Sequence, residues 1–254
     1  MNISKVLFFA SSDRGLEDGI SSRTSFLFLS HTAFLKNSII CLLLSFTTII
    51  ANAQSQSEAE FKKTLHDRSV KIVNTLEITD SGKYNKVVDV IADQYFDLNK
   101  IHDKTKESVA AIKLLQLPDE EKSGRVQKEE EQKAAQLRKL HNGFIAKLQK
   151  ELTEVQVEKV KDGMTYRVMP ITYGAYLDMI LTLTAEQKDK IYSWLKEARE
   201  LAMDEGSSED KHKIFGKYKG KINNYLSAQG YDMKKEEKAW QERLKEKRQK
   251  EVSG

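Results

Sequence analysis

Apolar side chains recur every three or four residues along most of the chain after Ser57, the spacing of an amphipathic helix. Ser57 can cap a first helix, and Thr79 or Asp80 can cap a second that we expect to continue to Leu115. Pro118 interrupts the pattern, and the three acidic residues after it suit the start of a third helix. The pattern therefore predicts an all-α fold built on apolar stripes.

Two further helices are predicted to begin in the same way, at Thr153 and at Thr184, each followed three residues later by glutamine. The helix after Thr153 is expected to end near Gly163. Ser208 can cap a later helix that Gly230 closes. With the first three helices, this gives a bundle of about five to seven helices.

One stretch, residues 164–180, is predicted to be irregular, because it holds Pro170, Gly174 and three tyrosines. We expect it to lie over the end of the helix that begins at Ser208. The chain from Met233 onward is strongly charged and is predicted to form a helical tail. The predicted organisation is a leader over 1–53, a helical domain over 54–232 and a charged helical tail over 233–254.

The leader has the pattern of a signal peptide. Residues 39–50 form an apolar run of 12 residues, Lys36 precedes it, and Ala-Asn-Ala follows it. We expect cleavage before Gln54, which leaves no integral membrane segment, since a span needs about 20 apolar residues. Residues 1–34 do not fit a signal peptide, and we interpret them as mis-assigned upstream sequence, with a genuinely long leader as the alternative.

Composition narrows the functional classes. Charged residues make up 31% of the 254-residue chain and apolar residues 39%, which excludes a polytopic membrane protein. Lys and Arg (42) nearly balance Asp and Glu (38). The net charge therefore creates no strong positive electrostatic field that would favour nucleic acid as a partner. The single cysteine, Cys41, lies in the apolar run of the leader, so the mature chain has no disulfide and no thiolate.

We find no pattern typical of a catalytic or cofactor site. The four histidines after the leader lack metal-ligand spacing, and nucleophile elbows and phosphate-binding loops are absent from the sequence. The best catalytic candidates are Glu200 and Asp204, which we expect to lie beside Tyr218. A row of carboxylates on one helix, however, is usually the solvated face of that helix, and glycoside hydrolysis needs two carboxylates across a cleft. We therefore expect no enzyme, no metal and no cofactor. The histidines, expected on surfaces or helix flanks, are His66, His102, His141 and His212.

Tyrosines and amides gather in the carboxyl-terminal third of the domain, and this combination suits sugar. Tyrosine rings can stack on sugar rings, while amide side chains bond hydroxyl groups as donor and acceptor. Arg199 could hold an acidic sugar by a bidentate contact, although an ion pair inside the bundle is the stronger interpretation. The alternative for the tyrosines is that half of them belong to the core. The candidate carbohydrate-binding residues are Tyr166, Tyr173, Tyr176, Asn223, Asn224, Tyr231 and Arg199.

Three motifs in this region are specific enough to suggest a family. They cover residues 160–166, residues 197–208 with Lys211, and residues 215–226 with Gly230 and Tyr231. Together they resemble the domain-of-unknown-function family 3826, over about residues 58–231. The resemblance implies an exported, sugar-binding protein of a polysaccharide-degrading bacterium, and it brings no catalytic residues with it.

A second resemblance stays open. The Leu-Thr-x-x-Gln helix starts at Leu152 and Leu183 are similar to those of small periplasmic helical stress proteins, which hold unfolded clients or metal. Our functional hypothesis is a non-catalytic accessory protein of a bacterial polysaccharide-utilisation system, periplasmic or outer-membrane-associated in a Gram-negative cell. Its expected partners are an oligosaccharide or polysaccharide and outer-membrane sugar-uptake proteins. The alternative is a periplasmic helical chaperone-like or structural interaction protein.

Overall fold

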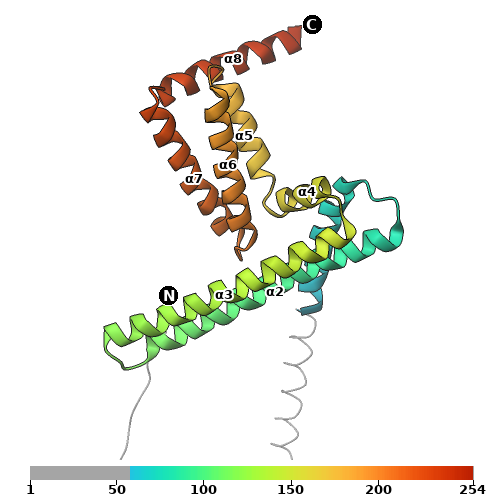
Figure 1. The fold of residues 1–254 in the computed structure, drawn as a ribbon, viewed down its shortest axis with the longest axis vertical. Coiled ribbons are helices and arrows are strands. Elements are labelled where there is room, and N and C mark those ends of the chain that lie inside the picture. Colours follow the sequence, from blue (N-terminus) through green and yellow to red (C-terminus); the bar gives the residue numbers. More distant parts are fainter. Residues whose placement is uncertain (1–57, 254) are drawn as a thin grey trace, which may run out of the picture. The chain divides into compact units, whose positions relative to one another are not determined.

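The computed structural model describes residues 58–253, so the predicted leader and its cleavage site lie outside the described residues. All regular structure in the described part is helical, as the apolar pattern predicts (Figure 1). The helices outnumber the five to seven expected. After helical residues 58–73 come η1 (Asn74–Leu76), α2 (Ser81–Leu114), α3 (Asp119–Glu151), α4 (Glu154–Met164), α5 (Val168–Met179), α6 (Ala185–Met203), α7 (Ser208–Ala228) and α8 (Met233–Ser253).

α2 and α3 form a long antiparallel hairpin whose ends match the sequence signals (Figure 1). The Asp80 carboxylate caps α2 by accepting a hydrogen bond of 2.6 Å from the backbone N–H of Lys83. α2 ends at Leu114, and Pro118 stands immediately before α3, where a missing N–H costs nothing. Three acidic residues in the first turn of α3 complement the positive end of the helix dipole.

The two predicted threonine caps are confirmed as reciprocal capping boxes. The Thr153 hydroxyl accepts from the Gln156 N–H at the start of α4, and the Thr184 hydroxyl accepts from the Gln187 N–H at the start of α6. The cap of α7 is displaced by one residue from the prediction. Ser207 rather than Ser208 caps it, by accepting from the N–H of Asp210.

The prediction of an irregular segment over 164–180 is wrong for most of its length, because Val168–Met179 forms α5. Pro170 is the third residue of this helix, where its missing N–H would have no partner inside the helix. The irregular part is only the turn before α5, where Tyr166 and Arg167 both have left-handed backbone angles (φ 57° and 56°). Proline and glycine thus mark the start and middle of a helix here rather than a loop.

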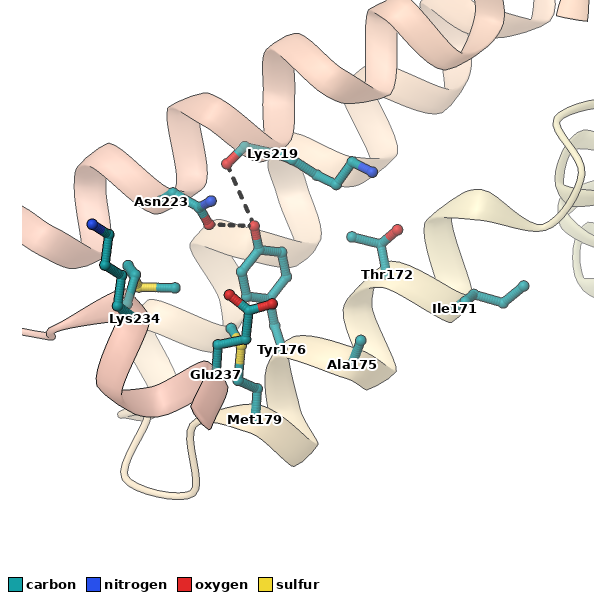
Figure 2. Close-up of a pocket in the computed structure, with 10 residues that line it drawn as sticks. Ile171, Thr172, Ala175, Tyr176, Met179, Lys219, Asn223, Lys234 and Glu237 are labelled. Carbon is teal, nitrogen blue, oxygen red and sulfur yellow. Dashed lines mark hydrogen bonds between the residues drawn. The ribbon is translucent and has the colours of Figure 1, made fainter. Parts of the chain in front are cut away.

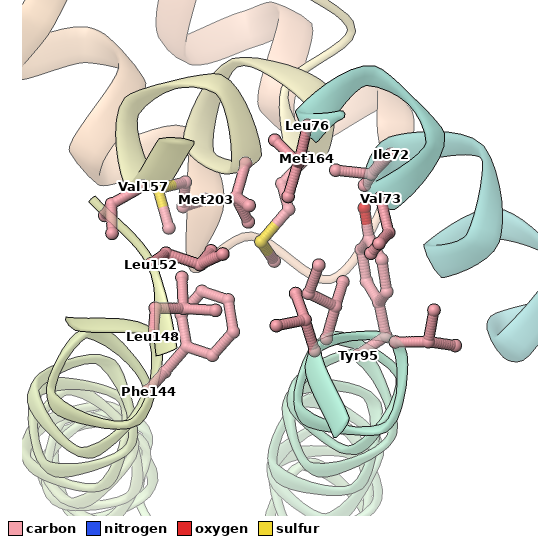
Figure 3. Close-up of a cluster of buried hydrophobic side chains, with 14 of the residues drawn as sticks. Ile72, Val73, Leu76, Tyr95, Phe144, Leu148, Leu152, Val157, Met164 and Met203 are labelled. Atoms are coloured by element: carbon pink, nitrogen blue, oxygen red, sulfur yellow. The ribbon is translucent and has the colours of Figure 1, made fainter. Parts of the chain in front are cut away.

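Two clusters of buried apolar side chains hold the helices together. The first joins helical residues 58–73 to α2, α3 and α4, with Tyr95, Leu148 and Met164 among its members (Figure 3). The second lies between α5, α6 and α7, with Tyr176, Leu195 and Phe215 among its members. Helix α6 belongs to both, because its body packs in the second cluster and its last residue, Met203, in the first.

Candidate functional site

A groove lies where α5, α7 and α8 meet, with a volume of about 500 Å³ (Figure 2). That volume lies within the range of about 300–1,000 Å³ typical of small-molecule sites. Its walls combine hydroxyl, amide, ammonium and carboxylate groups with aliphatic and thioether side chains. The groove is lined by Ile171, Thr172, Ala175, Tyr176, Met179, Lys219, Asn223, Met233, Lys234 and Glu237.

Tyr176 and Asn223 form the polar centre of the groove (Figure 2). The Tyr176 side chain is only 6% exposed, and its hydroxyl donates to Asn223 Oδ1 across 2.6 Å. Burial raises the pKa of Tyr176 to about 12, so the hydroxyl stays protonated at neutral pH. Because the amide oxygen of Asn223 is held by this bond, the exposed Asn223 side chain presents its amide nitrogen as a donor.

Charged and apolar groups surround this pair. Lys219 comes from α7, while Lys234 and Glu237 come from α8 on the opposite wall (Figure 2). Met179 and Met233 supply flexible apolar surface, which adapts readily to a ligand's shape. The groove can therefore accept a molecule that carries both hydroxyl groups and C–H faces.

Helix α8 is fixed against the end of α5 by two side chains. The Trp240 ring N–H donates to the Asp178 carboxylate across 2.6 Å. The Arg243 guanidinium donates to the backbone carbonyls of Asp178 and Met179, at 2.8 and 3.0 Å, where a cation also complements the negative end of the α5 dipole. These contacts position one wall of the groove relative to the others.

The remaining aromatic and amide candidates lie elsewhere, so the structure does not bring the predicted residues into one concavity. Tyr173 packs edge-on against Tyr192 at 5.3 Å between ring centres. The Tyr231 hydroxyl bonds Gln187 and the backbone carbonyl of Thr182. Asn224 is exposed on α7 and does not line the groove, and Tyr166 is exposed in the turn before α5.

Arg199 lies inside the bundle and not at a sugar-binding surface. Its side chain is 1% exposed, and its guanidinium donates to Asp162 across 2.7 Å and to Glu158, both on α4. Glu200 accepts a further bond from it at 3.1 Å. Arg199 therefore forms the ion pair inside the bundle and not a sugar contact, because α4 packs its acidic face on α6.

The carboxylates considered for catalysis are engaged in the same polar layer. Glu200 contacts Lys161 at 3.0 Å, and Asp204 contacts His141 at 3.0 Å. Tyr218 instead pairs with Glu197: burial raises its pKa to about 12, and a hydrogen bond with Glu197 adds to the shift. No carboxylate pair facing an open cleft is formed by these residues.

Two of the histidines expected on the surface make contacts inside the bundle. His102 on α2 is partly buried, with Nε2 2.7 Å from the backbone carbonyl of Asp204, and His141 on α3 contacts the Asp204 carboxylate. In the described part of the chain, no group of three or more His, Cys, Asp or Glu side chains is arranged to hold a metal ion.

None of the helices among residues 58–253 is both long and apolar enough to cross a membrane.

Sequence reasoning missed most of the groove. Lys219 has no role in the predicted site, and Met233, Lys234 and Glu237 fall in the predicted charged tail. The available signal was Trp240, a large aromatic residue in an otherwise charged helix, which indicates that α8 docks on the bundle. Met179 carried no signal of its own, since its role depends on the position of α8.

Comparison with known proteins identifies the family of this chain. The family model described as "Protein of unknown function (DUF3826)" matches residues 62–246, which is more than half of the chain and includes all of the groove residues. This confirms the resemblance drawn from the motifs between residues 160 and 231. No curated protein matches the chain.

Proposed function

We propose that this chain, which belongs to the DUF3826 family, binds carbohydrate in the groove between α5, α7 and α8. The observation that carries the proposal is the Tyr176–Asn223 pair, a protonated hydroxyl and an amide fixed side by side in a cavity of about 500 Å³. Sugars offer hydroxyl groups that need directional donors and acceptors, together with C–H faces that need apolar contact. The groove supplies the first from Tyr176, Asn223 and the charged side chains, and the second from its methionines.

The proposed setting is an exported, non-catalytic accessory role in a bacterial polysaccharide-utilisation system, beside outer-membrane sugar-uptake proteins. Its support is the signal-peptide pattern of the sequence up to residue 53, and the resemblance implies the same setting. The carboxylates that could have formed a catalytic pair are occupied by Arg199, Lys161 and His141, which favours binding over catalysis.

The alternative, a periplasmic chaperone-like or structural interaction protein, needs a wide exposed apolar surface. The large apolar side chains exposed in the described part come from several separate helices and turns, among them Leu114, Val155, Ile171 and Leu201. Singly exposed apolar residues of this kind are normal on soluble proteins. We therefore favour the groove.

A glycan array followed by calorimetric titration tests the proposal, and two neighbouring asparagines on α7 give a matched pair of variants. Asn223→Ala removes an exposed side chain of the groove and should weaken glycan binding about tenfold, the scale of one good hydrogen bond. Asn224→Ala removes another exposed amide, which lies outside the groove, and should leave affinity within about twofold. Equal losses in both variants would contradict the groove.

An absence of binding to any tested glycan would contradict the carbohydrate proposal itself. Suppression of the aggregation of an unfolded client protein, measured on the same preparation by light scattering, would then support the chaperone-like alternative. Tyr176→Phe, which keeps the buried ring, serves as a second variant that should also weaken glycan binding, because it removes only the hydroxyl.

A further inference from the structure

A second cavity, of about 240 Å³, lies between helical residues 58–73, α2, the turn before α5 and the start of α7. It shares no residue with the groove. Three groups in its lining can donate hydrogen bonds to a ligand: a guanidinium, a buried ammonium and a phenol. The cavity is lined by Phe61, Thr64, Leu65, Arg68, Tyr95, Leu98, Asn99, Tyr166, Glu205, Gly206, Ser208 and Lys211.

Arg68 supplies the guanidinium. Its side chain is exposed, and the guanidinium carbon lies 5.3 Å from the centre of the Tyr95 ring. No described residue accepts a hydrogen bond from the guanidinium, so its N–H groups can exchange water for a ligand. Since the side chain lines the cavity from helical residues 58–73, it can present two parallel donors to a planar anion.

Lys211 supplies the ammonium. Its side chain is 4% exposed, and Nζ donates to the backbone carbonyls of Ala202 and Met203 at 2.9 and 3.1 Å. An ammonium group has three donors, so one is left without a partner among the described residues. Glu205 is the one carboxylate in the cavity lining, against the two cations Arg68 and Lys211, which leaves an excess of one positive charge.

Tyr95 supplies the phenol. It is 8% exposed and lines the cavity from α2. A phenol hydroxyl can both donate and accept, so it can bond to a molecule held in the cavity. Burial raises the pKa of Tyr95, so the phenol is a neutral donor at physiological pH.

We propose that this cavity binds a small organic carboxylate, with Arg68, Lys211 and Tyr95 as donors to its anionic group. One negative charge matches the single excess positive charge of the lining. The planar guanidinium fork suits a carboxylate, and Phe61 and Leu98 offer apolar contact to the carbon skeleton. This proposal does not rest on carbohydrate binding in the groove.

Calorimetric titration of the purified chain with D-glucuronate and L-lactate tests it, with D-glucose and inorganic phosphate as comparison ligands. Binding of either carboxylate, with neither comparison ligand binding as tightly, supports the proposal. Arg68→Gln should weaken that binding at least about tenfold, while Lys71→Gln, an exposed lysine on the same helix, should leave it within about twofold. Tyr95→Phe should also weaken it, with circular dichroism showing the fold retained.

Proton uptake on binding provides a second measurement, separate from affinity. Burial lowers the pKa of Lys211 to about 8, and a bound anion favours its charged form, so carboxylate binding at pH 8 should take up protons. The groups that face Lys211 are Arg68, Asp204 and Glu205. The observed heat of binding should then differ between two buffers with different ionisation enthalpies.

Three outcomes would overturn the proposal. The first is that neither carboxylate binds, the second is that phosphate or glucose binds as tightly, and the third is that Arg68→Gln has no larger effect than Lys71→Gln. Asn223→Ala separates the two sites, since it should leave carboxylate binding unchanged. A loss of carboxylate binding in Asn223→Ala would place the ligand in the groove instead.

Discussion

Nδ1 of His141 on α3 lies 3.0 Å from Oδ1 of Asp204, at the carboxyl end of α6, across 63 residues of sequence. This contact fastens the α2–α3 hairpin to the second cluster of helices. The hydrogen bond to Asp204 raises the pKa of His141, and the Asp204 and Glu200 charges add to it, while burial and Lys161 oppose it. The contact is therefore strongest when the imidazole is protonated.

We expect His141→Gln to destabilise the protein more at acidic than at alkaline pH. Because the folded-state pKa is raised, the stabilisation is fully present below the unfolded value of about 6.5 and is lost as pH rises through the folded value. Urea unfolding at pH 5.5 and pH 9 should show a difference of the order of 1 kcal/mol in the effect of the substitution. His66→Gln, at an exposed histidine, is the control, and an equal pH dependence in both variants would contradict the assignment.

Arg199→Met should cost about 3–5 kcal/mol of unfolding free energy, because it leaves Asp162 and Glu158 without their buried partner. Arg125→Gln breaks an exposed ion pair with Glu121 within α3 and should cost less than about 1 kcal/mol. Denaturant unfolding of both variants at pH 7 measures the contrast. Similar costs would mean that the polar layer between α4 and α6 contributes little.

Gly206→Ala should destabilise the fold by about 1–3 kcal/mol, since the new Cβ would lie 2.8 Å from Cγ of His102. The ring cannot turn away without stretching its 2.7 Å contact with the Asp204 carbonyl. Gly216→Ala, on the exposed side of α7 with nothing within 4 Å, should instead stabilise by up to about 1 kcal/mol. Thermal unfolding midpoints that move in the same direction would contradict this pair of expectations.

Lys211 gives a pH dependence of the opposite sign to that of His141. Burial lowers its pKa to about 8, so between pH 8 and about 10.5 the unfolded chain holds a proton that the folded chain has lost, and stability rises with pH. Relative to Lys211→Met, the wild-type protein should gain about 2–3 kcal/mol over this interval. Denaturant unfolding at pH 7.5 and pH 10 measures the gain, and Lys71→Met controls for the substitution itself. A constant offset between wild type and Lys211→Met would contradict the shifted pKa.

Local signals in the sequence predicted the helices well, because caps and turns are decided by residues a few positions apart. Asp80, Thr153 and Thr184 each satisfy a backbone donor within their own first turn, so their role is visible in the sequence. The segment of α5 was misread since Pro170 breaks a helix interior but is harmless in a first turn. The position of a proline in a helix decides whether it breaks the helix or is tolerated.

The candidate site was predicted only in part, because it depends on packing over long sequence distances. Tyr176 and Asn223, both candidate carbohydrate-binding residues in the sequence, meet across 47 residues. For Arg199 the sequence favours an ion pair inside the bundle, but which carboxylates it meets depends on how α4 packs on α6. Nothing local distinguishes Lys219, which lines the groove, from the other lysines of α7.

Helix α6 places consecutive residues in different apolar clusters, Ala202 in the one with α5 and α7, and Met203 in the one with α2 and α3. Neither cluster can open fully without disturbing the last turn of α6, which also carries Asp204 and the carbonyls that bind Lys211. Such an element couples regions that could otherwise exchange their amide protons independently. We expect the two clusters to melt as one cooperative unit, with the amides of that last turn among the slowest to exchange.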